Sequence, residues 1–121
     1  MAARPTPEPP EFATVRAIAL ALPGVTEGTS YGTPAFRVGK TFLTRLHQDG
    51  AAIVLRVGFD ERAMLMEADP ASFFITEHYR AYPAMLVRLA TVPRPVLERL
   101  LVERWRAAAP RRAVAAYDAG R

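Results

Sequence analysis

The chain has 121 residues, half of them hydrophobic and 23% charged, with no cysteine and a formal net charge of +4. This length fits one domain, and the lack of cysteine excludes disulfides, zinc–thiolate sites and thiol nucleophiles. No 18-residue apolar run is present and residues 1–10 lack an apolar signal segment, so we expect a cytoplasmic protein without a membrane partner.

The first elements can be placed from proline positions and apolar spacing. Residues 1–10 contain four prolines and are expected to form a disordered tail before one domain over residues 11–118. Apolar residues recur at helical spacing over residues 11–22, and Pro23-Gly24 ends this predicted helix. Residues 28–34 are rich in turn formers and lead into a sheet.

Two hairpins are predicted next, and their loops set which residues share a face. Strands over residues 35–38 and 41–47 flank Gly39-Lys40. A two-residue loop there would pair Arg37 with Phe42 and set a charge on the apolar face, so we expect a three-residue loop. Asp49-Gly50 indicates a two-residue type I′ turn. That turn would set Leu46 opposite Ile53 and Arg45 opposite Val54.

The second half adds helices and one further strand. Asp60 is the expected N-cap of a helix through residue 68, with Met64, Leu65 and Ala68 inward. Residues 73–75 are expected to be buried, 76–83 to form a polar loop, 84–91 a strand, 93–108 a helix, and 110–117 a last short helix. This order predicts an α+β fold in which helices pack on one face of an open antiparallel sheet.

Side-chain alternation places the arginines of four predicted strands on one sheet face. These are Arg37, Arg45, Arg56 and Arg88. The opposite face is expected to be apolar, with Phe36, Val38, Phe42, Leu46, Ile53, Leu55, Val57, Met85, Val87 and Leu89. A cationic face suggests an acidic or polyanionic partner. The alternative is a face that is merely solvated, since exposed arginine on an antiparallel sheet needs no function.

The loop over residues 76–83 is the densest cluster of versatile side chains. It could bind a small anion through His78, Arg80 and Tyr82, and the site would be completed by Ser30, Tyr31 and Arg37. The alternative is a structural loop whose imidazole and phenols bond to the backbone. Because no catalytic or metal-ligand spacing accompanies these residues, we expect no enzyme, no metal and no cofactor.

Several segments resemble the MmcQ/YjbR family. They are residues 28–40 and 78–83, then Leu86-Val87-Arg88-Leu89, Trp105-Arg106 and Ala115-Ala116-Tyr117-Asp118. The resemblance covers about residues 12–118 and implies a fold similar to the bacterial frataxin homologue CyaY, described as a double-wing DNA-binding motif. The hairpins around Gly39-Lys40 and Asp49-Gly50 would be the wings. The acidic iron-binding helix of frataxins has no counterpart here, because Glu11 is the only acid in the first predicted helix.

Two functions follow as hypotheses. The first is a non-enzymatic DNA-binding protein that contacts phosphates through Arg37, Lys40, Arg45, Arg56 and Arg88. The second is a small-ligand or protein-interaction module centred on the His78 loop. A continuous basic stripe would favour nucleic acid, and a pocket of several hundred cubic ångströms would favour a ligand.

Overall fold

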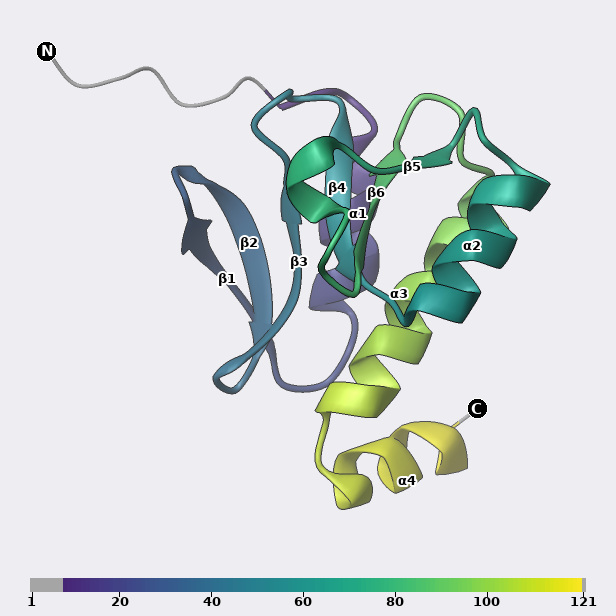
Figure 1. Ribbon diagram of the computed structural model, residues 1–121. Coiled ribbons are helices and arrows are strands. Elements are labelled where there is room, and N and C mark those ends of the chain that lie inside the picture. The colour runs from purple at the N-terminus through teal and green to yellow at the C-terminus, as the bar shows by residue number, and fades with distance from the viewer. Residues whose placement is uncertain (1–7, 121) are drawn as a thin grey trace, which may run out of the picture.

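The computed structural model describes residues 8–120, which fold into a six-stranded antiparallel sheet and four α-helices (Figure 1). The strands follow the order β1-β2-β3-β4-β6-β5 across the sheet. The elements are α1 (Phe12–Leu20), β1 (Val25–Ser30), β2 (Thr33–Val38), β3 (Thr41–Leu46), β4 (Ala52–Arg56), α2 (Phe59–Ala68), β5 (Phe73–Phe74), the 3-10 turn η1 (Glu77–Tyr79), β6 (Ala84–Arg88), α3 (Arg94–Ala108) and α4 (Arg111–Ala119). The predicted α+β class is confirmed.

The predicted tail falls mostly outside the described residues, which exclude 1–7. Its last residues lead directly into α1, where the Pro9 carbonyl accepts a hydrogen bond from the amide of Phe12 at 2.9 Å. None of the helices within residues 8–120 is long and apolar enough to cross a bilayer.

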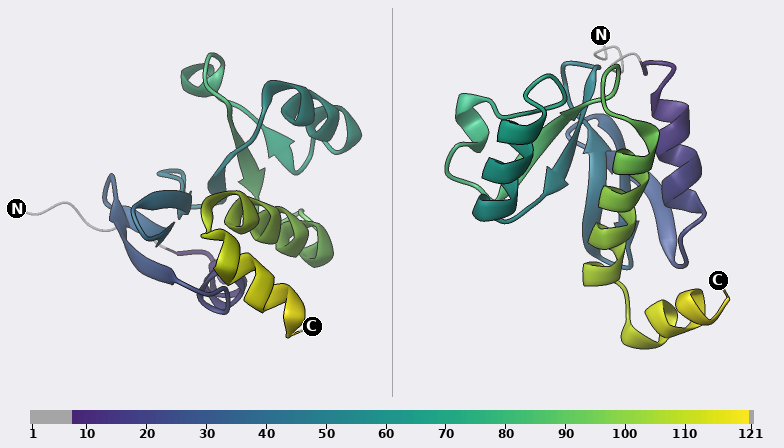
Figure 2. Two further views of the ribbon diagram at one scale, coloured as in Figure 1. Left: turned by 90° about the horizontal axis from the view of Figure 1, so that it is seen from below. Right: turned by 90° about the vertical axis from the view of Figure 1, so that its right-hand side faces the viewer.

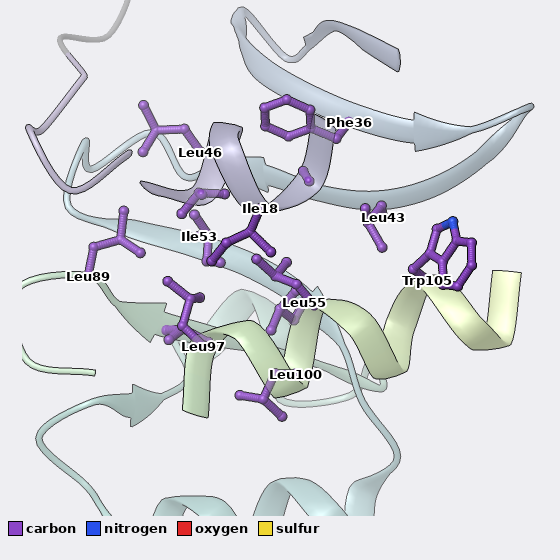
Figure 3. Packing of buried hydrophobic residues seen from close by; sticks show 14 of the residues in the cluster. Ile18, Phe36, Leu43, Leu46, Ile53, Leu55, Leu89, Leu97, Leu100 and Trp105 are labelled. Atoms are coloured by element: carbon purple, nitrogen blue, oxygen red, sulfur yellow. The ribbon is translucent and has the colours of Figure 1, made fainter. Parts of the chain in front are cut away.

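Helices α1 and α3 cover one face of the sheet and enclose the main core (Figure 2). Trp105 of α3 is fully buried, and its indole N–H donates to the Pro23 carbonyl at 2.8 Å, which ties α3 to the end of the α1 segment. Figure 3 shows side chains of α1, α3 and the strands packed together in this layer. The core includes Phe36, Val38, Leu43, Leu46, Ile53, Leu55, Val57, Met85, Val87 and Leu89.

The turn between β2 and β3 corrects one expectation. Val38 pairs with Thr41 across a two-residue Gly39-Lys40 loop, and Arg37 pairs with Phe42, so the predicted three-residue loop is wrong. An irregularity follows in the ladder, and Phe36 pairs with Thr44. One extra residue in a strand reverses its alternation, which is how a β-bulge changes the facing of the side chains beyond it.

The bulge sends Leu43 into the main core and Phe42 to the opposite face. Leu43 is 1% exposed within the main cluster, whereas Phe42 packs against a second cluster on the other side. The expected placement of Phe42 among the core-facing residues is therefore also wrong. The extra residue that keeps Arg45 and Leu46 on their predicted faces therefore lies within β3, and not in the loop as expected.

The turns of the other two hairpins also differ from expectation. Leu46 pairs with Ile53 and Arg45 with Val54, as predicted, but Asp49 does not have the positive φ that a type I′ turn requires. Instead its carboxylate accepts the amides of Ala51 and Ala52, at 2.8 and 3.1 Å. A turn with two positive φ values lies at Tyr31-Gly32, where φ is 53° and 78°. It joins β2 to β1, a strand that the sequence pattern did not predict.

Helix α2 is less buried than expected. Gly58 occupies its N-cap position, and Asp60 lies in the first turn without capping through its side chain. Met64 is 71% exposed, contrary to the prediction that it points inward, and Leu65 only partly packs against the core. Figure 2 shows α2 beside the β5–β6 edge of the sheet, so only one flank of the helix meets the core.

Candidate functional site

The face of the sheet opposite α1 and α3 carries all four predicted strand arginines. The register places Arg45 opposite Val54, Arg56 opposite Ala84 and Arg88 opposite Ala52. Arg37 lies on the same side, because Ala35, two residues before it, pairs with Arg45. We call this side the arginine face. It also holds a second apolar cluster: Ala52, Val54, Ala84 and Leu86, with Phe42, Phe74 and Tyr79 packed against it.

A pocket of about 830 Å³ opens on the arginine face. It lies between the Tyr31-Gly32 turn, strands β3 and β4, and the 76–83 loop. Its lining combines residues from both functional hypotheses: Ser30, Tyr31, Phe42, Arg45, His47, Gln48, Val54, Arg56, Thr76, His78, Tyr79, Tyr82 and Ala84. The structure therefore brings two of the predicted phosphate-contacting arginines together with four of the six predicted ligand residues, without Arg37 and Arg80.

Arg45 lies at the base of this pocket and is only 6% exposed. Among the described residues, its guanidinium donates only to neutral oxygens, including the Tyr79 hydroxyl at 3.1 Å and the Thr33 hydroxyl at 3.3 Å. The Leu46 carbonyl and the Gln48 amide oxygen accept its other bonds, at 3.2 and 3.3 Å. Within residues 8–120 no carboxylate forms an ion pair with it. Arg45 is thus a buried cation whose charge no described acid compensates.

Tyr31 covers this guanidinium from the solvent side. Its ring centroid lies 5.1 Å from the Arg45 guanidinium carbon, and the residue is 81% exposed. Tyr31 has the one positive φ found at a non-glycine residue in the described chain. A left-handed backbone costs such a residue about 1–2 kcal/mol. The hairpin therefore holds an exposed aromatic ring over a buried cation at a cost in backbone strain.

The second pocket arginine is at the rim. Arg56 is exposed, and its guanidinium lies 5.7 Å from the Phe42 ring centroid. Phe42 reaches this position because of the bulge at Leu43. No described carboxylate pairs with the Arg56 side chain either.

The opposite wall is the 76–83 loop, which Arg62 of α2 holds in place. Its Nη1 lies 3.0, 2.7 and 3.1 Å from the carbonyl oxygens of Tyr79, Tyr82 and Ala84. Nη2 donates to the carbonyl of Arg80 at 3.1 Å. Local residue spacing does not indicate this contact, because Arg62 lies 17 or more positions before its acceptors.

The aromatic side chains of this wall contact one another. The His78 ring lies 4.8 Å from that of Tyr79, edge to face, and 5.7 Å from that of Tyr82. His47, which directly follows β3, also lines the pocket, and its ring lies 6.2 Å from that of Tyr79. The His47 Nδ1 lies 3.3 Å from a carboxylate oxygen of Asp49.

The Asp49 carboxylate is held in its charged form by groups of its own turn. Burial raises the pKa of this carboxyl, but hydrogen bonds from the amides of Ala51 and Ala52, together with His47, outweigh burial and lower the pKa overall. Across residues 8–120 there is no group of three histidine or acidic side chains placed to hold a metal ion.

The remaining predicted site residues lie away from the pocket. Arg80 is exposed and pairs with Glu77 at 2.9 Å. Arg37 reaches the Thr29 carbonyl at 3.5 Å, and Lys40 is exposed in the β2–β3 turn. Arg88 donates to the Ala71 carbonyl and lies 4.4 Å from the Phe74 ring centroid.

Part of this chain is similar to two mycobacterial proteins. Over 53 residues it is 42% identical to the uncharacterized proteins Rv2570 of Mycobacterium tuberculosis (strain ATCC 25618 / H37Rv) and Mb2600 of Mycobacterium bovis. That match covers 44% of this chain and 41% of each relative, so the chain spans about two fifths of their length.

The fold has a solved counterpart in the Deinococcus radiodurans protein DR2400, a DUF419 domain. The TM-score is 0.63 at 25% sequence identity, over 75% of this chain and 72% of the other. The family model YjbR matches residues 20–107, which include the whole sheet and the pocket. This chain is therefore a member of the YjbR family.

Proposed function

We propose that this protein is a non-enzymatic module that binds a small organic anion in the pocket of the arginine face. One observation carries the proposal: Arg45 is almost fully buried at the base of that pocket and bonds only to neutral oxygens among the described residues. An anion in the pocket would compensate this charge.

The energetics of a buried guanidinium support this reading. Removing an ion from water costs several kcal/mol even after relaxation of the protein. Hydrogen bonds from the charged guanidinium to neutral acceptors offset part of that cost, and the Coulomb attraction of an anion is stronger in a partly buried site than in water. The free energy still to be gained at Arg45 is therefore available to a ligand that brings a carboxylate or phosphate oxygen.

The shape of the pocket agrees with a small molecule. Ligand pockets measure about 300–1,000 Å³ and are lined mainly by apolar and aromatic side chains with a few placed polar groups. This one measures about 830 Å³, and its walls include the rings of Tyr31, Phe42, Tyr79 and Tyr82. Hydroxyl donors from Ser30 and Thr76 are also available.

A thermal-shift titration tests the proposal. Benzoate, acetate and phosphate are added as ligands at constant ionic strength, and chloride is the control. A ligand that binds only the folded state stabilises it by about 2.7 kcal/mol at a hundredfold excess over its Kd. Benzoate should raise the Tm of the wild type, and Arg45→Met should abolish that shift. Arg80→Met is the matched control, because this exposed arginine lies outside the pocket.

Two results would overturn this function. One is a wild-type Tm that no anion raises beyond the chloride control. The other is an Arg45→Met protein that keeps the full benzoate shift. Should Arg45→Met fail to fold, Tyr31→Ala takes its place, since this 81% exposed ring can be removed without opening the core and should weaken benzoate binding.

A second candidate function is DNA binding, as first proposed from the sequence. The supporting observation is the charge distribution on the strands. Glu27 is the one acid in the six strands, and it lies opposite Phe36 and bonds to Arg16 on the helix side. The arginine face therefore has no strand carboxylate to repel phosphates, and Lys40 is exposed at the end of its β2–β3 hairpin.

Salt dependence tests this candidate. If the hairpin contacts phosphates, duplex affinity measured by fluorescence anisotropy should fall steeply with salt. Lys40→Ala should lower affinity for all sequences alike and reduce the salt slope by about one. Arg99→Ala, on the exposed side of α3, is the control. Undetectable duplex binding at low salt would remove the DNA hypothesis.

A further inference from the structure

We infer that the ligand of this pocket is an organic dianion with a flat body, with one anionic group at Arg45 and a second, separate group at Arg56. This inference rests on the proposed function and deepens it. It follows from three features of the pocket: two cations in neighbouring strands, their unequal burial, and the aromatic wall that the 76–83 loop forms.

The two guanidinium groups come from diagonal positions on one face. Arg45 of β3 pairs with Val54 of β4, and Arg56 lies two residues further along β4. Diagonal neighbours in an antiparallel pair are roughly 7–8 Å apart. Both side chains line the same pocket, so one molecule of moderate length can reach both.

Each guanidinium has its own aromatic partner and its own depth. Tyr31 lies over Arg45 at 5.1 Å, and Phe42 lies beside Arg56 at 5.7 Å. Arg45 is 6% exposed, whereas Arg56 is open to solvent. Because the two cations have different aromatic neighbours and different exposure, they present two anion positions, one deep and one at the rim, instead of one clamp around a single group.

The space between these positions favours a planar ligand. His78, Tyr79 and Tyr82 form a continuous run of ring contacts on the loop side, at 4.8 and 5.7 Å. Aromatic rings bind flat ligands by offset stacking or edge-to-face contact. No aspartate or glutamate lines the pocket within the described chain, so nothing there opposes a second negative charge.

Four probes separate the elements of this inference. Isophthalate has two carboxylates on a flat ring, and benzoate has one carboxylate on the same ring. Glutarate has two carboxylates without a ring, and phenyl phosphate concentrates its charge in one group. We expect isophthalate to bind about tenfold more tightly than benzoate in isothermal titration, the factor that one charge-assisted contact supplies at an exposed site.

Variants of Arg56 identify the rim contact. Arg56→Met should reduce the isophthalate-to-benzoate affinity ratio to about one while leaving benzoate binding nearly unchanged, because the deep position remains. Arg56→Lys should restore part of the ratio by keeping the charge. Arg37→Met is the matched control, since this arginine lies on the same face but outside the pocket. The isophthalate-to-benzoate affinity ratio of this variant should equal that of the wild type.

The outcomes distinguish this inference from the proposed function. If benzoate binding depends on Arg45 but isophthalate binds no more tightly than benzoate, the inference of two anion positions is overturned. The proposed anion-binding pocket is then still supported. If phenyl phosphate binds more tightly than isophthalate, the inference that the ligand carries two separate anionic groups is overturned. If glutarate binds as tightly as isophthalate, the inference that the ligand has a flat body is overturned. Failure of all four probes to bind overturns both proposals.

Discussion

Replacing Arg62 with methionine should destabilise the folded protein and loosen the wall of the pocket. Methionine keeps most of the side-chain length and its packing but removes the charge and the donors. Arg62 is the one side chain in the described chain that joins α2 to four carbonyls of residues 79–84. Its loss should therefore free the 76–83 loop while leaving the main core intact.

The size of the effect follows from the contacts. Nη1 carries two hydrogens and cannot bond fully to three carbonyls, so the four contacts count as about three hydrogen bonds. Hydrogen bonds to a charged group contribute about 1.5–3 kcal/mol each, but water can reach these carbonyls once the arginine is gone. We expect a loss of about 2–3 kcal/mol in the free energy of unfolding. At about 4 °C per kcal/mol, the Tm should fall by about 8–12 °C.

Urea unfolding and hydrogen exchange measure the two consequences. Exchange should accelerate at the amides of Tyr79 and Tyr82, which bond within the loop to Thr76 and Tyr79. Arg80→Met is the control: its ion pair with Glu77 has both side chains more than 70% exposed, and such a pair contributes about 0–1 kcal/mol. If Arg62→Met cost no more than Arg80→Met, the anchoring role of Arg62 would be refuted.

Three further substitutions test the packing, the charge and the strain described above. The Arg16 guanidinium lowers the pKa of Glu27 below its ordinary value of 4.5, so the ion pair stabilises the protein fully above that pH and the effect is lost as pH falls through the folded-state pKa. Glu27→Gln should accordingly lower the free energy of unfolding by about 0.5–1 kcal/mol at pH 7 and by progressively less as the pH falls below 4.5, and a loss that does not change with pH in urea unfolding would contradict this. Leu101→Ala, in the fully buried stripe of α3, should cost about 2–5 kcal/mol by the same assay, whereas Leu20→Ala at a 46% exposed position should cost under about 1. Tyr31→Asn should be more stable than Tyr31→Ala by about 0.5–1 kcal/mol, because asparagine tolerates the left-handed backbone and both variants lose the ring; equal Tm values would argue against strain at this turn.

Some features of the site were predictable because they depend on spacing within one strand. Alternation along each strand put Arg45 and Arg56 on one face, and the register confirms that placement. The buried residues of α3 likewise recur at helical spacing on one face of the helix: Leu97, Leu100, Leu101 and Trp105. The same reasoning failed at Phe42, since nothing in the local sequence marks the extra residue that reverses its direction.

The α+β class, the apolar faces of the first and third helices, and the side of the sheet on which the arginines lie are predictable from the chain alone. These properties follow from residue periodicity, which is local. Three features of the site appear only in the folded protein: the burial of Arg45, the bonds from Arg62 that fasten the 76–83 loop, and the Tyr31 ring that covers the cation. Each of these depends on partners 12 to 34 positions away, such as Thr33 and Tyr79 for Arg45, and contacts between distant segments exist only once the strands have paired and the loops have closed over them.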